Sequence, residues 1–90
     1  MGIAAVKMKL MPTSPDINFE KIKEKSKELV KRSGGKNCKF EEEPIAFGII
    51  AIIVFFAWPE EQELDSLEEE FKKIENINSV ELIDIRRAFG

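Results

Sequence analysis

The sequence predicts an α+β fold, with one four-stranded antiparallel sheet and two helices on one face of that sheet. The chain has 90 residues, of which 43% are hydrophobic, enough for one small core and a single domain over residues 1–90. Three segments have the apolar pattern of strands, a fourth is polar and extended, and two have apolar residues at helical spacing. The longest apolar run, residues 45–58, is too short to cross a bilayer as a helix, so no membrane partner is expected.

The first strand and the first helix are predicted from the first 35 residues. Residues 3–11 alternate between apolar and other side chains around Lys7 and Lys9, which is typical of a strand. The next residues, PTSPD, have the composition of a turn, and Asn18 can cap the helix that follows. Apolar residues at helical spacing continue this helix as far as Gly34-Gly35.

The second and third strands are predicted to form a hairpin. Residues 37–43 are polar and extended in character, and Pro44 breaks this strand before the apolar run begins. Residues 45–58 are rich in Ile, Val and aromatic residues, so they predict the third strand.

The second helix and the fourth strand complete the pattern. Pro59 ends the third strand, and the glutamates after it favour a helix N-terminus. Apolar residues at spacings of three, four and three predict the helix, at Leu64, Leu67, Phe71 and Ile74. Residues 76–79 are a predicted loop and residues 80–87 a predicted strand. The adjacent Leu82 and Ile83 break strict alternation, which indicates a β-bulge or leaves the facing of this strand open.

The order strand, helix, strand, strand, helix, strand is that of a ferredoxin-like α/β sandwich, βαββαβ. Right-handed crossovers place the first and third strands at the centre, and the charged second strand suits an edge. The bulkier even-numbered residues of the third strand are expected to pack on the helices. Its odd-numbered residues would then form an open apolar face, covered by a partner or by a second copy in a homo-oligomer.

The composition excludes most catalytic chemistry. The chain has no His and no Tyr, and Cys38 is its one cysteine, so it can form neither an internal disulfide nor a Cys/His zinc site. The usual nucleophile and base pairs are equally out of reach, and Cys38 is expected to be a small apolar residue. Neighbouring carboxylates at Glu41, Glu42 and Glu43 alternate in direction along a strand and cannot converge on a metal. We therefore expect no enzyme activity, no metal and no cofactor, and a cytoplasmic location.

Charge is distributed unevenly along the chain. Residues 1–40 carry ten basic and four acidic groups, net +6, and residues 41–90 carry four basic and thirteen acidic groups, net −9. This asymmetry indicates either solvated helix faces or steering toward a charged partner. The overall acidity argues against nucleic-acid binding, and Glu-Glu-Glu-Pro precedes the AFGIIAIIV segment where an RNA-recognition strand would need a basic residue.

Three segments carry a resemblance to a known family: MPTSPDINFEKIK, EEEPIAFGIIAI and VELIDIRRAFG. Across almost its whole length the chain resembles archaeal elongation factor 1-beta, the guanine-nucleotide exchange factor for elongation factor 1-alpha. The resemblance implies a single exchange domain that binds this GTPase, disturbs its magnesium and phosphate site, and lets GDP leave so that GTP can enter. Such a function needs differential binding and no catalytic acid or base.

The resemblance also implies partner-binding residues. The family's Phe-Gly signature matches Phe47 and Gly48, three residues after Pro44, which belongs to the same segment. The sequence alone predicts that Phe47 lies on the odd, open face of the third strand. Ordinary packing of this aromatic ring is the alternative. Eukaryotic relatives carry a lysine near the C-terminal end that reaches the magnesium region, whereas this chain has Arg86 and Arg87 there. These arginines either substitute for the lysine or form a solvated edge. A homo-oligomeric, ligand-sensing ferredoxin-like module is the alternative function.

Overall fold

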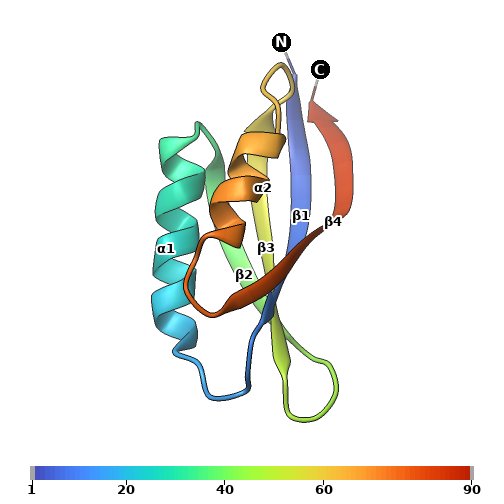
Figure 1. Ribbon diagram of the computed structural model, residues 1–90. Coiled ribbons are helices and arrows are strands. Elements are labelled where there is room, and N and C mark those ends of the chain that lie inside the picture. Colours follow the sequence, from blue (N-terminus) through green and yellow to red (C-terminus); the bar gives the residue numbers. More distant parts are fainter. Residues whose placement is uncertain (1, 90) are drawn as a thin grey trace.

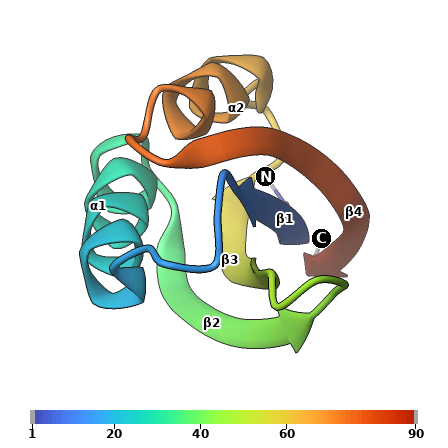
Figure 2. The same cartoon turned by 60° about the horizontal axis from the view of Figure 1, so that its bottom comes forward.

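The computed structural model describes residues 2–89, which form the predicted ferredoxin-like α+β fold (Figure 1). Four antiparallel strands lie in the order β2-β3-β1-β4, so the predicted central strands are confirmed. Figure 2 shows β2 and β4 curving around the outside of the sheet, with both helices on one side. The elements are β1 (Ile3–Pro12), α1 (Phe19–Arg32), β2 (Lys36–Pro44), β3 (Ile50–Pro59), α2 (Asp65–Lys72) and β4 (Ile77–Phe89).

Local signals set the limits of α1. The Asn18 side chain accepts a hydrogen bond from the Lys21 backbone N–H at 3.2 Å, which confirms the predicted cap. After the helix, Gly34 has a φ of 100° and turns the chain toward β2. A Cβ at Gly35 would lie 2.6 Å from Val30 Cγ1, so this position requires glycine for the strand to pass close to the helix.

The core lies between the helices and the even-numbered side of the two central strands, as predicted. Phe56 makes edge-to-face contacts with Trp58 and Phe71, at centroid distances of 5.8 and 6.4 Å. The Trp58 indole N–H donates to the Gln62 carbonyl at 3.0 Å, which satisfies this donor inside the core. The largest fully buried apolar side chains are Phe71, Met8, Leu10, Ile52, Leu67, Val6, Val30 and Val54.

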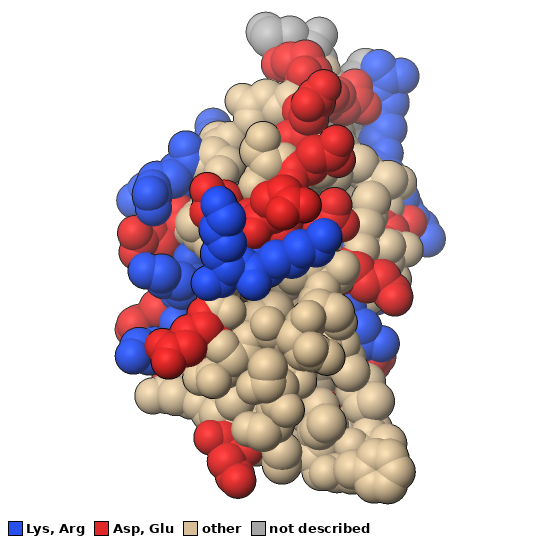
Figure 3. Space-filling view, in the orientation of Figure 1, with Lys and Arg blue, Asp and Glu red and all other residues tan. Residues whose placement is uncertain are grey.

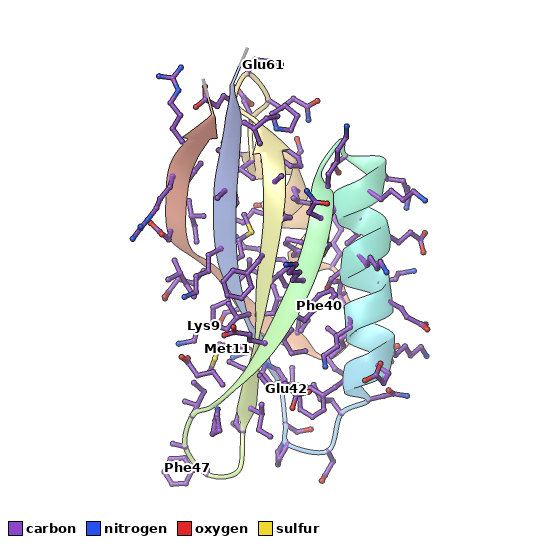
Figure 4. All side chains as sticks on the ribbon, turned by 180° about the vertical axis from the view of Figure 1, so that it is seen from behind. Lys9, Met11, Phe40, Glu42, Phe47 and Glu61 are labelled. Carbon is purple, nitrogen blue, oxygen red and sulfur yellow. The ribbon has the colours of Figure 1, made fainter. Side chains whose placement is uncertain are left out.

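The sheet face opposite the helices, here called the open face, is not the exposed apolar surface that the sequence predicts. Ala51 and Ile53 of β3 are only 0% and 3% exposed. Lys9 reaches across β3 from β1, and its Nζ lies 3.0 Å from Glu43 Oε2 on β2 (Figure 4). The prediction was wrong because long lysine side chains cover neighbouring apolar residues with their methylene groups. A homo-oligomer through this face stays a prediction.

A second lysine covers the same face further along β3. Lys7 Nζ lies 5.2 Å from the centre of the Phe55 ring, in cation–π contact. Lys7 is paired opposite Phe55 in the sheet register, so the contact follows from the alignment of β1 with β3. Phe55 is therefore half-buried although no helix packs on it.

The edge strand β2 carries the charges that were predicted for an edge. Glu41 and Glu43 face the open side, and Glu42 turns toward α1, where Lys23 Nζ lies 2.9 Å from its carboxylate (Figure 4). This divergence confirms that the three carboxylates do not converge. Among residues 2–89, no group of three or more potential metal ligands lies together.

Several predicted boundaries were wrong. α2 is Asp65–Lys72, so Leu64 and Ile74, predicted as helical positions, flank it. The third strand begins at Ile50 and not at residue 45, because residues 45–49 form a turn. The fourth strand begins at Ile77, because Pro12 and Met11 of β1 pair with Ile77 and Ser79 in a segment predicted to be a loop. The predicted bulge is confirmed: Met8 pairs with Leu82 and Lys7 with Asp84, which leaves Ile83 as the extra residue.

Candidate partner-binding site

An exposed aromatic ring marks one end of the molecule. The loop between β2 and β3 projects beyond the sheet, and Phe47 lies at its tip, directed away from the body of the protein (Figure 4). Its side chain is 96% exposed, far more than that of any other large hydrophobic residue described. An aromatic ring in this position contributes nothing to the core, so burial against a partner is the favourable state for it.

The backbone at this tip is also held in an unfavourable conformation. Phe47 and Gly48 have φ values of 57° and 75°, which are those of a type I′ hairpin turn. The Ile49 N–H donates to the Ala46 carbonyl at 3.0 Å, and the Ile45 N–H donates to the Ile49 carbonyl at 2.8 Å. Glycine accepts a left-handed conformation readily, whereas a side chain such as Phe loses about 1–2 kcal/mol. Strain and exposure at the same aromatic residue indicate a functional position.

This geometry corrects the predicted location of Phe47. The sequence placed it on the open face of the third strand, but two successive positive φ values are incompatible with a strand. Pro44 is the last residue of β2 and pairs with Ile50, so the turn begins directly after it. The structure therefore brings Pro44, Phe47 and Gly48 together in one exposed hairpin.

The hairpin turn and the loop beside it contain almost no charged residues. Residues 44–50 contain no charged residue, and the neighbouring β1–α1 loop, residues 13–18, contains only Asp16. A Cβ at Gly48 would lie 3.9 Å from Pro15 Cβ, which shows that the two loops lie together. In Figure 3 the lower part of the molecule is accordingly a broad uncharged surface. We call residues 13–18 and 44–50 the hairpin end.

Sequence reasoning missed two parts of the hairpin end. Ile45 is 42% exposed and lies on the same turn as Phe47, and Pro15 reaches the turn from a loop about 30 residues earlier in the sequence. The one signal in the sequence is the lack of charge in both segments. Ile45 was taken for a strand residue because its apolar character fits the run that follows.

The two predicted arginines lie at the opposite end. Arg86 pairs with Ala5, which pairs with Ala57 on β3, whereas Pro44 pairs with Ile50. Seven residue steps along β3 separate these two positions, or about 23 Å at ~3.3 Å per residue. The structure thus does not bring the arginines and the hairpin together, and the predicted residues form two separate groups.

Each arginine has a carboxylate partner, and the two lie on opposite faces. Arg86 Nε lies 2.8 Å from Asp84 Oδ2 on the open face, and Arg87 Nε lies 2.9 Å from Glu60 Oε2. The arginine side chains are 80% and 69% exposed. Exposed pairs of this kind contribute little stability, so either guanidinium can exchange its carboxylate for another anion at low cost. We call these four residues the arginine end.

The long-range charge pattern follows the two helices. α1 carries six basic and three acidic residues, and α2 carries four acidic residues and one lysine, and Figure 3 shows both kinds of charge side by side on this side of the molecule. α1 is therefore net basic and α2 net acidic, so the charge asymmetry of the chain reappears in its two helices. The hairpin end lies outside both.

Cys38 is half-buried against the core, as predicted for a small apolar residue. Burial raises the pKa of the Cys38 thiol from 9.0 to about 11, although the nearby Lys27 lowers it. The thiol is therefore protonated and unreactive near neutral pH. In the part of the chain that the structure describes, no helix is long and apolar enough to cross a membrane.

Comparison with known proteins gives one consistent result. Residues 5–88 match the EF-1 guanine nucleotide exchange domain. The chain is similar to elongation factor 1-beta of Methanococcus vannielii, with 38% identity over 87 residues that cover 94% of this chain and 97% of the relative. It is also similar to elongation factor 1-beta of Thermococcus gammatolerans and Pyrococcus horikoshii, with 35% and 34% identity over 89% of each chain.

Proposed function

We propose that this chain, which belongs to the EF-1 guanine nucleotide exchange domain family, acts on elongation factor 1-alpha through its hairpin end and its arginine end. The chain is a guanine-nucleotide exchange factor of translation elongation and promotes the replacement of GDP by GTP. We assign the exchange domain to residues 1–90. Such a factor acts in the cytoplasm, where elongation takes place, and performs no covalent chemistry of its own.

The observation that carries the proposal is the exposed, strained Phe47. An aromatic anchor that enters a pocket on a partner contributes about 2 kcal/mol or more to binding. Because the turn already holds the ring outward, no loop has to be ordered on association, which lowers the entropic cost of binding. Pro44 and Gly48 contribute by fixing this turn, and Ile45 extends the apolar contact.

The arginine end supplies charge to the same partner. Arginine binds phosphate or carboxylate groups in a bidentate manner, and both kinds of group surround a bound magnesium nucleotide. Since Arg86 and Arg87 lie on opposite faces of β4, we expect one of them to make the direct contact. We assign it to Arg86, which is the more exposed and lies on the open face.

Exchange follows from differential affinity alone. A factor that binds the nucleotide-free GTPase more tightly than the GDP-bound form weakens GDP binding by the same factor. Coupling energies of about 1–3 kcal/mol correspond to roughly 5- to 150-fold changes in affinity. No acid, base or metal ligand in the exchange factor is required, which agrees with a chain that has no His and no Tyr.

The direct test is release of fluorescent GDP from elongation factor 1-alpha in excess unlabelled GTP. Substoichiometric amounts of the protein should accelerate release, because each molecule acts repeatedly. Phe47→Ala should require roughly 30-fold more protein for the same rate. Phe55→Ala is the matched control, because it removes the same ring from the open face, away from the hairpin. Equal losses in the two variants, or no acceleration by the unmodified protein, would overturn the proposal.

A further inference from the structure

A small pocket lies between α1 and residues 73–76, the segment that connects α2 to β4. Its volume is about 320 Å³, at the lower end of the range for ligand pockets, which suits a side chain or a small ion. Ile22 and Ile74 line it and are only 3% and 8% exposed, so its floor is apolar. We call it the lysine pocket. The polar residues of its rim are Asn18, Lys21, Lys25, Glu75 and Asn76.

Two lysines make this rim positive. Lys21 and Lys25 are four residues apart on α1, so their side chains lie on the same side of the helix. Both are exposed, and neither forms an ion pair within residues 2–89. Lys23, in contrast, pairs with Glu42 of β2 at 2.9 Å. The two lysines at the pocket therefore keep their full capacity to bind an anion.

The other rim residues leave this positive character in place. Glu75 is the one acidic residue of the rim, against two lysines, and the side-chain amides of Asn18 and Asn76 can donate to an anion. Asn18 Oδ1 already accepts the Lys21 N–H at 3.2 Å, so the pocket does not depend on a free helix N-terminus. An apolar floor below a positive rim rich in donors fits a carboxylate on a short apolar stem, which is the side chain of an acidic residue.

The lysine pocket continues the hairpin end. Asn18 belongs to both, and the Thr13 N–H donates to the Asn76 carbonyl at 2.9 Å, so the β1–α1 loop contacts the segment that borders the pocket. Figure 1 shows the start of α1 and the loop before it at the end of the molecule where the β2–β3 hairpin lies. A protein that buries Phe47 can therefore extend across this loop to the two lysines.

This continuity determines which anion the pocket binds. A free carboxylate in solution would contact the open pocket from one side and bind weakly. An acidic side chain of a protein already held at Phe47 is present at a high effective concentration, so even a weak contact adds to the affinity. We infer that the lysine pocket binds an acidic side chain of the GTPase, an inference that rests on the proposed function. Charge complementarity at this second point also fixes the orientation of the partner, which contact with one aromatic ring does not.

The affinity for nucleotide-free elongation factor 1-alpha tests the inference. Lys21→Glu and Lys25→Glu should each raise the Kd about tenfold, because a carboxylate then faces the acidic side chain of the partner. The double variant should lose more affinity than either single variant. Lys25→Arg keeps the charge and should bind almost as well as the unmodified protein. Isothermal titration calorimetry measures these constants, and circular dichroism establishes that each variant is folded.

Lys27→Glu is the matched control. It makes the same charge change on α1, but Lys27 lies near Cys38 of β2 and does not border the lysine pocket. This variant should bind the GTPase like the unmodified protein. Equal losses in Lys25→Glu and Lys27→Glu would show that only the net charge of α1 matters, and would overturn the inference.

Phe47→Ala, measured in parallel, separates a failure of this inference from a failure of the proposed function. If Phe47→Ala weakens binding about 30-fold while both pocket variants bind like the unmodified protein, the inference is wrong and the proposed function holds. If the unmodified protein does not bind the GTPase, both are wrong.

Discussion

The hairpin end and the arginine end differ in charge, in backbone geometry and in the partners of their side chains. At the hairpin end an almost fully exposed Phe47 lies on a strained turn. Asp16 is the one charged residue among residues 13–18 and 44–50. At the arginine end residues 84–87 pair with β1 in extended strand between two irregularities of the ladder, and both guanidinium groups already contact carboxylates. Apolar contact gives affinity that salt hardly affects, whereas charged contact is screened by salt. The two ends are thus suited to different parts of one binding event.

The largest effect is expected when both ends are changed at once. Phe47→Ala should weaken binding to the GTPase about 30-fold and Arg86→Ala several-fold. Because the two sites lie about 23 Å apart along β3, their effects should add in free energy, and the double variant should lose on the order of 100-fold. Exchange titrations of the two single variants and the double variant measure this. A double variant no worse than Phe47→Ala would mean that the arginine end takes no part.

Salt should affect the contacts of the two ends differently, and its effect on the exchange rate should be smaller than that of the double substitution. Raising ionic strength from about 0.05 to 0.5 M should slow exchange by the unmodified protein several-fold, since it screens the arginine contacts. Phe47→Ala should keep this salt dependence, and Arg86→Ala should show a weaker one. Arg87→Ala is the matched control and should behave like the unmodified protein. Identical salt dependence in all four proteins would contradict the assignment of charge to Arg86.

The hairpin should also show opposite effects on stability and binding. Phe47→Asn creates Asn-Gly, the preferred pair for a type I′ turn, and should recover about 1 kcal/mol of the cost of the left-handed conformation at this position. For a domain of this size the melting temperature should rise by a few degrees, at ~4–8 °C per kcal/mol. GDP release by the same variant should slow as it does for Phe47→Ala. A lower melting temperature would show that Phe47 contributes to the fold and not to partner binding.

The smallest effect concerns Cys38, which lies in neither end and reports on the body of the sheet. Burial raises the pKa of Cys38 to about 11, so between about pH 9 and 11 an unfolded chain would lose the thiol proton while the folded chain keeps it. The contribution of the Cys38 thiol to the free energy of unfolding is therefore complete below about pH 9, and it decreases as the pH rises toward about 11. Melting temperatures of the unmodified protein and Cys38→Ala should diverge slightly over this range. Thiol alkylation at pH 8 should be slow, and equally slow in Phe47→Asn and Arg86→Ala.

The sequence was sufficient for the fold because apolar periodicity determines which elements form and which faces are buried. The even-numbered side of β3 packs on the helices, and the adjacent Leu82 and Ile83 mark the bulge in β4. Periodicity also led to the wrong start of β3. Residues 45–49 are as apolar as the strand that follows, and only the backbone angles of Phe47 and Gly48 reveal the turn.

Features that depend on register could not be predicted. The contact of Lys9 with Glu43 needs two strand alignments, β1 with β3 and β2 with β3, and neither is encoded in local composition. The same holds for the separation of the two ends. Pro44 and Arg86 were both predicted as site residues, but their distance follows from the pairing of both edge strands with the central ones.

The central position of β1 has a consequence for how the chain folds. β1 is the first of the six elements and β4 the last, yet they are neighbours, and Ile3 pairs with Phe89 (Figure 1). During synthesis on the ribosome, β1 can pair with β3 but must wait for β4, so one side of it stays unpaired until nearly every residue has been added. Contacts between segments so distant in sequence slow folding, because a long loop must close before they form. The nascent chain therefore passes through a stage in which β1, rather than β4, is the exposed edge.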